Sequence, residues 1–553
     1  SVTRLDFLVS NFGLRREGGT WLVLSNEFGY ISGREQRVEF TLRDVPEGDY
    51  DAMRFQIGLE PAINHQNPAK YPAGHPLNPD VDGLHWGWMG GYVFLALEGR
   101  WLESLSNPAQ EANGYSFHLA TDPQLMTINL PATFGVSNDV ALVAEFDVAR
   151  LFNGPGSLRL SRTTNSTHSR TNDAVATLLH REIETAFRVL SISPMENSSG
   201  IAAAQLTRVE IGPHTTLHPF RFSGLFPQPA LPRDNPLTEE GIALGRRLFF
   251  DARLSRNNQQ ACASCHDPSH GFSQNRPVSV GAEGQPGTRN AMGLFNLAWK
   301  TRFFWDGRAA TLRQQVLQPI QNPLEMNQSL TNVVAKLSDA SQPHSGDSGH
   351  ENYPELFNRA FGSRQITADR IARALEQFLL AQVSDSSKFD LVLAGEAKFS
   401  VAEQRGFELF NTEYDPPRGF HGADCFHCHG GPLFQSQSFA NNGLESNPTD
   451  PGRFAATGRE ADRGKFAVPS LRNVELTAPY MHDGRFQTLE QVIEHYSSGV
   501  KPSATLDPNL AKHPQGGLNL SQSDKQALVA FLKTLTDERF VRPRVLVAGA
   551  RRE

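Results

Sequence analysis

Cysteine is scarce in this chain, since the 553 residues contain only four. No apolar run approaches the roughly 20 residues that a membrane-spanning helix needs, so we expect no membrane span. The formal net charge of −7 is too mild to favour nucleic acid or an anionic membrane surface as a partner. The sequence begins at Ser1 without a basic or apolar leader, so we expect that any export signal has been removed.

All four cysteines lie in two C-x-x-C-H runs. A disulfide within each run would leave its histidine without a function, and zinc needs four ligands where each run supplies at most three. Covalent haem c uses every residue, because each thiol bonds a vinyl group and the histidine binds the iron. We therefore expect two haem c groups, with zinc and redox-active dithiols as alternatives. The haem-binding residues would be Cys262, Cys265, His266, Cys425, Cys428 and His429.

The first part of the chain has the pattern of an all-β, sandwich-like domain. β-branched and aromatic residues form short runs at 38–42, 92–97 and 141–146. Clusters of Gly, Asn and Pro separate these runs, as turns separate the strands of a sandwich. After about Phe220 a proline-rich stretch at 226–232 predicts a linker.

Beyond the linker the sequence predicts helices. The run TEEGIALGRRLF at 238–249 has a threonine cap before acidic residues, and similar patterns occur at 369–379 and 521–532. Each haem motif lies among such helices and long loops, so we expect a mostly α-helical part with two cytochrome-c-like lobes. The predicted boundaries are 1–213 for the β domain, 214–232 for the linker, and 233–390 and 391–545 for the two haem lobes.

Five further segments accompany the haem motifs: LFFDARLS (248–255), FWDGR (304–308), NPLEM (322–326), VPSLRNV (468–474) and APYMHDG (478–484). With them, residues from about 224 to 540 resemble the bacterial diheme cytochrome c peroxidase superfamily, and within it the MauG/MbnH branch. The resemblance covers almost the whole second part of the chain. It implies a two-lobed diheme fold and hydrogen peroxide as a substrate.

The resemblance implies an open first haem. Ordinary members carry a histidine in the loop after this haem, which blocks the iron until reduction frees it. The matching position here is Ala282, and alanine cannot bind iron. His270 is the nearby alternative, and we expect it to make a loop or propionate contact instead.

A second departure concerns the second haem. Ordinary members place a methionine on its distal side, and the matching position here is Tyr496. A tyrosinate oxygen stabilises high-valent iron and lowers the reduction potential compared with methionine. Met481 and His495 are the alternative ligands. His482, in the neighbouring motif, is also a candidate catalytic residue.

Other roles follow from the same resemblance. Trp305 matches a tryptophan between the haems that passes an electron hole, and Glu325 and Gln315 match residues lining the distal pocket of the first haem. Glu325 would exchange a proton with bound peroxide as a general acid–base. A structural calcium between the lobes would be bound by Asn290, Thr477 and Pro479, which offer hard oxygen ligands.

The β part has its own concentrated motif, GLHWGWMGGY at 83–92, with histidines before and after it. Taken alone, this motif is best explained by tryptophans in a sandwich core and solvated histidines. The whole set, however, resembles the MbnP family over most of residues 1–212. That resemblance implies that Trp86 or Trp88 is oxidised to kynurenine and that copper binds nearby through histidine. The candidate ligands are His65, His75, His85 and His118, of which His65 and His118 best fit the family pattern.

Together the two resemblances predict a natural fusion of an MbnP-like substrate with an MbnH/MauG-like enzyme of the bis-Fe(IV) type. Holes would leave the haem pair by long-range transfer to a tryptophan of the same chain, linking the protein to copper homeostasis. The linker would keep the substrate at high effective concentration. The alternatives are a peroxidase that detoxifies hydrogen peroxide with an external donor, and a copper-binding or electron-transfer protein. Because covalent haem is usually attached outside the cytoplasm, we expect a periplasmic, surface or secreted location.

Overall fold

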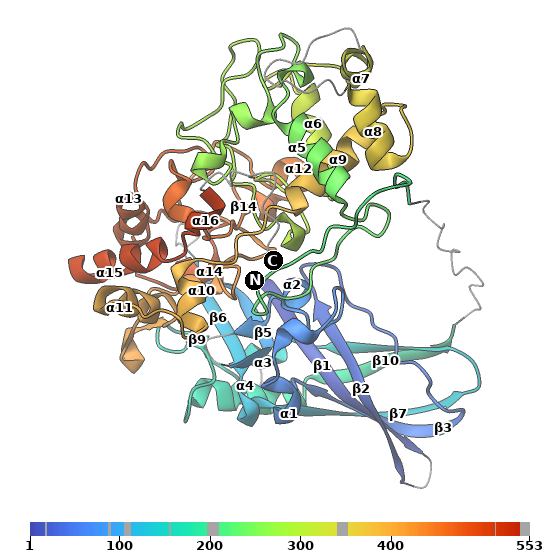
Figure 1. Ribbon diagram of the computed structural model, residues 1–553. Coiled ribbons are helices and arrows are strands. Elements are labelled where there is room, and N and C mark those ends of the chain that lie inside the picture. Colours follow the sequence, from blue (N-terminus) through green and yellow to red (C-terminus); the bar gives the residue numbers. More distant parts are fainter. Residues whose placement is uncertain are drawn as a thin grey trace.

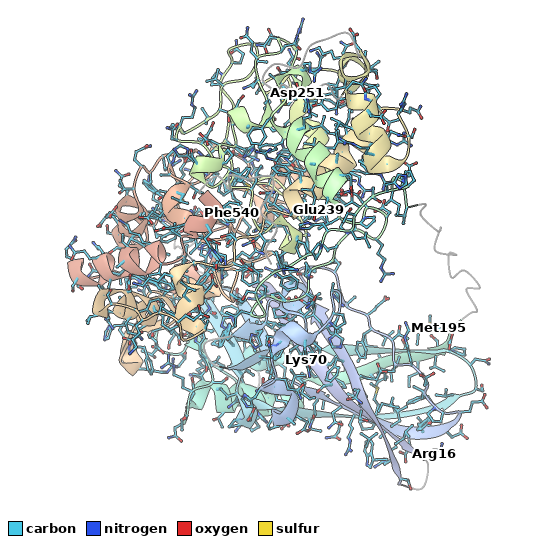
Figure 2. All side chains as sticks on the ribbon, viewed as in Figure 1. Arg16, Lys70, Met195, Glu239, Asp251 and Phe540 are labelled. Atoms are coloured by element: carbon cyan, nitrogen blue, oxygen red, sulfur yellow. The ribbon has the colours of Figure 1, made fainter. Side chains whose placement is uncertain are left out.

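The computed structural model describes residues 1–541 apart from the segments 17–18, 87–89, 104–111, 154–155, 196–208, 340–351 and 515. Figure 1 shows a β domain in blue to teal, a first helical lobe in green to yellow, and a second helical lobe in orange and red. In Figure 2, Arg16 lies at the outer end of the β domain and Asp251 at the outer end of the first lobe. The predicted fold class, a β domain followed by a two-lobed helical part, is confirmed.

Eight strands form the main sheet of the β domain, in the order β7-β3-β1-β5-β6-β9, with β2 paired to β1 and β4 to β5. The long strand β1 pairs with β5 through residues 2–7 and with β3 through residues 9–16, so it joins the two halves of the sheet. The strands are β1 Val2–Arg16, β2 Trp21–Ser32, β3 Gly48–Ile57, β4 His85–Trp86, β5 Gly91–Trp101, β6 Asn113–Ala120, β7 Met126–Val136 and β9 Ser166–Thr167.

A second, two-stranded sheet packs on the first. It consists of β8 Val140–Phe146 and β10 Phe187–Pro194. The rings of Phe146 and Phe187 stack with centroids 4.4 Å apart, and both make edge contacts with Phe7 of β1 at 6.1 and 6.2 Å. Aromatic side chains between two sheets are the core of a sandwich, which the sequence predicted.

Short helices close the ends of this sandwich: α1 Pro61–Asn64, α2 Pro79–Asp82, α3 Arg150–Asn153 and α4 Ala174–Glu184. The longest, α4, begins at Asp173, whose carboxylate accepts hydrogen bonds from two backbone N–H groups of the first turn. Leu179 and Ile183, one turn apart, are both buried on its inner face.

The runs predicted as strands at 92–97 and 141–146 lie in β5 and β8, but residues 38–42 do not form a strand. Strand β2 ends at Ser32, which pairs with Arg37 through an isolated bridge. Phe40 then packs against Phe12, with ring centroids 5.0 Å apart. Residues 38–42 therefore pack against a face of the sheet instead of pairing with a strand. β propensity does not distinguish these two arrangements.

The remaining helices are α5 Glu239–Phe249, α6 Leu312–Gln321, α7 Leu330–Ser338, α8 Tyr353–Phe361, α9 Ala368–Leu380, α10 Lys388–Leu393, α11 Val401–Phe410, α12 Phe454–Thr457, α13 Leu489–Glu494, α14 Pro508–Ala511, α15 Gln522–Lys533 and α16 Glu538–Val541. Four small strands accompany them: β11 Tyr414–Asp415, β12 Phe420–His421, β13 Phe439–Ala440 and β14 Phe466–Ala467. In the described part of the chain, none of the helices is both long and apolar enough to cross a membrane.

The two helical lobes repeat one packing arrangement, a helix pair that crosses at a glycine. In the first lobe α5 packs on α9, and a Cβ at Gly245 would lie 1.9 Å from the Ala374 carbonyl oxygen. In the second lobe α11 packs on α15, and a Cβ at Gly406 would lie 2.0 Å from the Ala527 carbonyl oxygen. Glycine is required at both crossings because the backbones approach too closely for any side chain.

The predicted lobe boundary at 390 falls inside α10. Phe389 of this helix packs with Phe407 and Phe531 of the second lobe, with ring centroids 6.3 and 6.2 Å apart. By packing, α10 therefore belongs to the second lobe. The first lobe accordingly ends in the connection that precedes Lys388.

The predicted linker is not a free tether. Just before it, the chain packs on α8, where the Gly212 N–H donates to the Ala360 carbonyl. Further along, Leu217 forms a bridge with Thr238 just before α5, and the Trp299 indole N–H donates to the Pro227 carbonyl over 2.7 Å. The described part of the linker thus lies along the first lobe as an ordered segment.

The β domain docks on the second lobe, although the first lobe follows it in sequence (Figure 1). A Cβ at Gly114 of β6 would lie 2.1 Å from the Pro508 carbonyl oxygen at the start of α14. Beside this contact the Arg100 guanidinium donates to the Ser503 carbonyl over 2.6 Å. Strands β5 and β6 therefore rest directly on the backbone of the second lobe.

Replacing Gly406 by alanine should destabilise the second lobe by about 1–3 kcal/mol, because the new methyl group would overlap a backbone carbonyl. Gly224→Ala is the matched control, since its Cβ would meet no heavy atom within 4 Å. Chemical unfolding of the haem-loaded protein, followed by circular dichroism and Soret absorbance, measures both. Equal stability of the two variants would contradict the close helix crossing.

Candidate functional site

The first C-x-x-C-H run contains a 3-10 turn, η4 Cys262–Ser264. Its histidine is held by two carbonyl groups, because His266 Nδ1 lies 2.9 Å from the Phe272 oxygen and 3.0 Å from the Met292 oxygen. This nitrogen therefore carries the proton, and Nε2 is left to bind a metal. Burial lowers the pKa of His266, which keeps the ring neutral, as ligation requires.

The second run repeats this arrangement with the turn η8 Cys425–His427. His429 Nδ1 lies 3.2 Å from the Phe434 carbonyl oxygen and 3.1 Å from the Pro469 carbonyl oxygen. Burial lowers the pKa of His429 to about 4. Its Nε2 is likewise the atom left for iron.

These donor sets fit covalent haem c. None of the four cysteines forms a disulfide, so all thiols are available to bond vinyl groups. Among the described residues, none of the four cysteines, nor His266 or His429, belongs to a group of three or more His, Cys, Asp and Glu side chains with metal-ligand spacing, which argues against zinc. Each oriented imidazole would supply the ligand on the protein side of one haem.

Glu325 lies close to the first haem motif. Burial raises the pKa of Cys262 to about 12, and the negative charges of Cys265 and Glu325 add to this effect. The pKa of Glu325 itself is raised by burial, against the opposing charge of Arg308. A carboxyl group with a raised pKa is suited to exchange protons. Gln315 is half-buried on α6.

The loop with Ala282 contacts the Glu325 segment directly, since the Ala282 N–H donates to the Glu325 carbonyl over 2.6 Å. A Cβ at Gly281 would lie 2.3 Å from the Leu324 carbonyl oxygen, so the two segments are tightly packed. His270 lies 3.0 Å from the Ser269 hydroxyl and 3.4 Å from the Asp267 carboxylate. These are local loop contacts of the kind expected for His270.

Tyr496 lies near the second haem motif. It is part of a π-helical turn, His495–Gly499, which directly follows α13. Burial raises the pKa of Tyr496, a hydrogen bond with Asn442 opposes the rise, and the sulfurs of Cys428 and Cys425 add to it. Single π-helical turns are frequent at functional sites.

Asn442 contacts both alternative ligands of the second haem. Its amide N–H donates to Met481 Sδ over 3.2 Å, and its carbonyl oxygen lies 2.9 Å from His495 Nε2. The His495 nitrogen is therefore occupied by the backbone. Tyr496 and Met481 remain as the side chains that Asn442 orients.

Trp305 lies between the two lobes. Its indole N–H donates to the Asn290 carbonyl over 2.8 Å, and its own carbonyl accepts from the Ala467 N–H of the second lobe over 2.7 Å. The Asn290 N–H in turn donates to the His482 carbonyl over 2.7 Å. The His482 ring stacks on Phe466 with centroids 3.7 Å apart.

The predicted calcium ligands lie beside this junction. The Asn290 amide donates to the Arg276 and Pro277 carbonyls over 3.2 and 3.1 Å, so its side-chain oxygen is the atom that could bind a cation. Thr477 donates its hydroxyl to the Val474 carbonyl. Pro479, which follows it closely in sequence, can offer only its carbonyl oxygen. A calcium ion here stays a prediction.

Three of the four histidines predicted to bind copper lie apart from one another. His65 is exposed and pairs with Asp122 at 2.9 Å, His75 stacks on Tyr71 with centroids 4.6 Å apart, and His85 makes an edge contact with Tyr92. Trp88, one of the two predicted sites of oxidation, lies outside the described residues.

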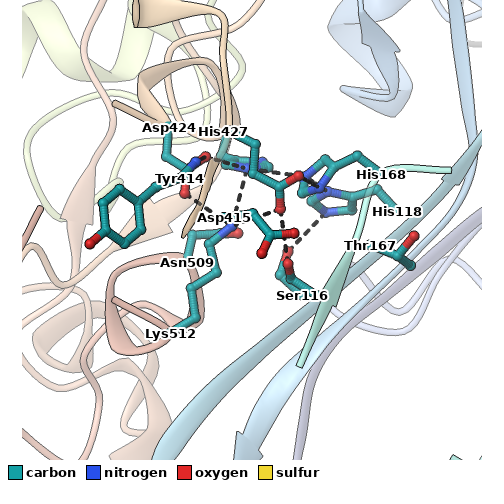
Figure 3. A network of polar contacts seen from close by, with 12 residues as sticks. Ser116, His118, Thr167, His168, Tyr414, Asp415, Asp424, His427, Asn509 and Lys512 are labelled. Atoms are coloured by element: carbon teal, nitrogen blue, oxygen red, sulfur yellow. Dashed lines mark hydrogen bonds and ion pairs between the residues drawn. The ribbon is translucent and has the colours of Figure 1, made fainter. Parts of the chain in front are cut away.

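The fourth, His118 of β6, belongs to a buried cluster of histidines between the β domain and the second lobe. His118 Nδ1 lies 3.1 Å from His168 Nε2, and His168 Nε2 lies 3.2 Å from His427 Nε2. His168 follows β9, and His427 lies between the two cysteines of the second haem motif. In the described part of the chain, this is the one group of three such side chains with metal-ligand spacing. Figure 3 shows the three rings converging from both sides of the interface.

Carboxylates lie behind two of the three rings. His118 Nε2 is 2.9 Å from Glu98 Oε1 of β5, and His168 Nδ1 is 2.6 Å from Glu413 Oε2 of the second lobe. The first contact has hydrogen-bond geometry, whereas the second is an ion-pair contact without hydrogen-bond alignment. The hydrogen bond places the His118 proton on Nε2, and the negative charge of Glu413 favours the His168 proton on Nδ1.

The third ring is flanked by a buried ion pair. His427 Nε2 lies 3.5 Å from the Lys512 ammonium and 3.4 Å from Asp424 Oδ1. Lys512 also contacts Asp424 at 3.0 Å and Glu413 at 3.8 Å. One ammonium group is therefore shared by two buried carboxylates.

All three imidazoles are neutral at ordinary pH. Burial lowers the pKa of His118 and, more strongly, that of His168. For His427, burial and the charge of Lys512 lower the pKa to about 3. Neutral imidazole is the form that binds metals.

Trp86 of β4 packs against this cluster. Its ring stacks on His168 with centroids 5.4 Å apart and makes edge contacts with His118 at 5.3 Å and with Phe426 at 5.6 Å. The ring centroids of Trp86 and His427 are 6.4 Å apart. Trp86 is only 7% exposed. A tryptophan of the β domain thus touches both residues that lie between the cysteines of the second haem motif.

Sequence reasoning missed His168 and His427. His427 is the first histidine of the run DCFHCH, which is a weak signal, because the residues between haem cysteines carry no fixed role. His168 lies in a polar stretch without any pattern. Only the docking of the β domain brings these two side chains together.

The chain is similar to known proteins in both parts. The family model described as di-haem cytochrome c peroxidase matches residues 239–398, and the one described as MbnP matches residues 1–169. Methylamine utilization protein MauG of Methylorubrum extorquens is 38% identical over 310 residues, which are 56% of this chain and 81% of that protein. Cytochrome c551 peroxidase of Nitrosomonas europaea is 36% identical over 308 residues, 55% of this chain and 82% of that protein.

A solved structure gives the same result. The crystal structure of a MauG-like protein associated with microbial copper homeostasis is 35% identical, covers 59% of this chain and 98% of its own, and has a TM-score of 0.51. The sequence-based recognition of a fusion is therefore confirmed. The chain belongs to the MauG-like branch of the di-haem cytochrome c peroxidase family, and carries an MbnP domain ahead of the peroxidase part.

Proposed function

We propose that this diheme oxidoreductase uses peroxide to oxidise Trp86 of its own β domain to kynurenine. The contact of Trp86 with Phe426 and His427, inside the second haem motif, carries this proposal. Because the Trp86 indole is buried, oxidants in the solvent have little access to it. The adjacent haem lobe is therefore the expected acceptor of its electrons. The same contact selects Trp86 from the predicted pair.

The haem groups, when bound, supply the redox chemistry with peroxide, and the residues of the chain supply proton transfer, ligation and paths for electrons. Glu325, with its raised pKa, takes a proton from peroxide and returns it to the leaving oxygen. Gln315 lines the same pocket. Trp305 connects the two lobes through Asn290 and Ala467. Tyr496, close to Cys425 and Cys428, would hold the iron of the second haem.

Trp86 is the electron donor at the end of this path. Two molecules of peroxide take up four electrons and four protons in all and are reduced to four molecules of water. Two water molecules give their oxygen atoms to the indole and release the four protons, so the ring opens to N-formylkynurenine with a net release of two molecules of water. Hydrolysis then releases formate and leaves kynurenine. The net change replaces one carbon of the side chain by oxygen.

We further infer a role in copper homeostasis in the periplasm. The MbnP match and the relative associated with microbial copper homeostasis support the link to copper. Covalent haem attachment supports the location. A structural calcium bound by Asn290, Thr477 and Pro479 is part of the same proposal.

Peptide mass spectrometry tests the tryptophan proposal. After peroxide treatment of the haem-loaded protein, Trp86 should appear as kynurenine, while it should stay intact in His266→Ala. Trp21 is the internal control, because it lies on β2 beneath Arg54 and is more exposed than Trp86. Random oxidation by peroxide would attack Trp21 first.

Intact Trp86 in treated wild type would contradict the proposal. A high turnover with external electron donors in the same sample would then favour a peroxidase that detoxifies hydrogen peroxide.

The first haem should be open in the oxidised protein as isolated, because Ala282 offers no ligand. Electron paramagnetic resonance should show one high-spin ferric haem. Ala282→His should convert it to low spin by restoring a ligand at this place, whereas Ala282→Leu should not. Two low-spin haems in the wild type would show that another side chain closes the site.

Replacing Tyr496 by phenylalanine should change the spectrum and raise the reduction potential of the second haem, while both haems stay attached. Met481→Leu is the matched control and should leave both properties as in the wild type. Redox titration followed by Soret absorbance measures the potentials. A shift in Met481→Leu without one in Tyr496→Phe would assign the ligand to Met481.

A further inference from the structure

The histidine cluster contains a contact that neutral imidazoles alone do not favour. His118 directs its Nε2 proton to Glu98, and the Glu413 carboxylate, 2.6 Å from His168 Nδ1, favours the His168 proton on that nitrogen. His118 Nδ1 and His168 Nε2, 3.1 Å apart, therefore face each other as two lone pairs. Two acceptors at this distance repel one another unless a cation lies between them.

Nε2 of His427 lies close to the same two nitrogens. His427 Nε2 lies 3.5 Å from the Lys512 ammonium and 3.4 Å from Asp424 Oδ1. Lys512 itself pairs with Asp424 at 3.0 Å, so the ammonium can satisfy this carboxylate and leave a lone pair on Nε2. This nitrogen lies 3.2 Å from His168 Nε2, and all three nitrogens lie within 4.8 Å of one another. An ion bound to three nitrogens at about 2.0 Å each would place them about 3.4 Å apart. The cluster is close to this geometry already.

The surroundings also suit a cation. The carboxylates behind His118 and His168 form the second layer that orients metal-binding histidines and raises their basicity. On the far side Glu413 and Asp424 share only one ammonium, that of Lys512. A bound cation would offset the remaining negative charge of these buried groups.

We propose that His118, His168 and His427 form a three-coordinate site for cuprous copper that joins the β domain to the second haem lobe. Imidazole suits copper. The site is buried beside Trp86, and the described residues supply three ligands there where zinc requires four. The choice of metal rests on the proposed link to copper, whereas the site itself rests on the geometry of the rings.

Two of the ligands come from the β domain and the third comes from the haem motif. The ion would therefore bind only when the two parts are docked, and by the same linkage it would stabilise the docked state. This ligand set differs from the sequence-based one, which grouped His118 with histidines that the structure places elsewhere.

Anaerobic titration of the haem-loaded protein with Cu⁺, against a chromogenic chelator, tests the site. Wild type should bind one ion per chain. His168→Ala and His427→Ala should weaken binding by at least about tenfold, the usual effect of disturbing a metal site, and His65→Ala and His75→Ala should not. If His427→Ala bound copper as tightly as the wild type, the bridging site would be wrong. A loss of copper affinity in His65→Ala would contradict it as well.

If a variant fails to fold, X-ray absorption spectroscopy of the copper-loaded wild type tests the ligand set directly. It should show three nitrogen ligands with imidazole scattering. A shell containing sulfur, or only one imidazole, would overturn the proposal. Oxidation of Trp86 is measured separately in metal-free protein, so a failure of the copper site and a failure of the proposed function give different results.

Discussion

The burial of charged groups between the β domain and the second lobe is the constraint on which the rest of the interface depends. Lys512, Glu413 and Asp424 are almost fully buried, and buried charges destabilise a protein unless they are paired. Some partners come from across the interface, as when the Ser166 hydroxyl of β9 donates to Glu413 over 2.9 Å. Such pairs fix the register of docking, and with it the place of Trp86 over the second haem motif.

The two lobes show how one scaffold serves two different haem sites. In each, two backbone carbonyls hold Nδ1 of the proximal histidine, and a glycine allows two helices to cross closely. The difference lies on the distal side, where the first lobe offers Ala282 beside Glu325 and the second offers Tyr496 in a π-helical turn. The shared features act through the backbone, whereas the distinct chemistry depends on single side chains in loops.

The haem motifs, the two lobes and the sandwich could be predicted because their signals are local: fixed cysteine spacing, helix caps and β-rich runs. Trp86 could be placed in a candidate pair for the same reason. His168 and His427 could not, since they are distant in sequence and meet only when two domains dock. The run at 38–42 was wrongly predicted as a strand, because packing on a sheet face and pairing at its edge favour the same residues.

The position of Phe426 and His427 has a consequence for the order in which the protein matures. Both residues lie between the cysteines that bond the second haem, and both are buried against Trp86 in the docked state. An enzyme that attaches haem has to enclose this segment, and it cannot do so once the β domain covers it. The β domain emerges first during synthesis, yet it has to dock last, after the second haem is in place.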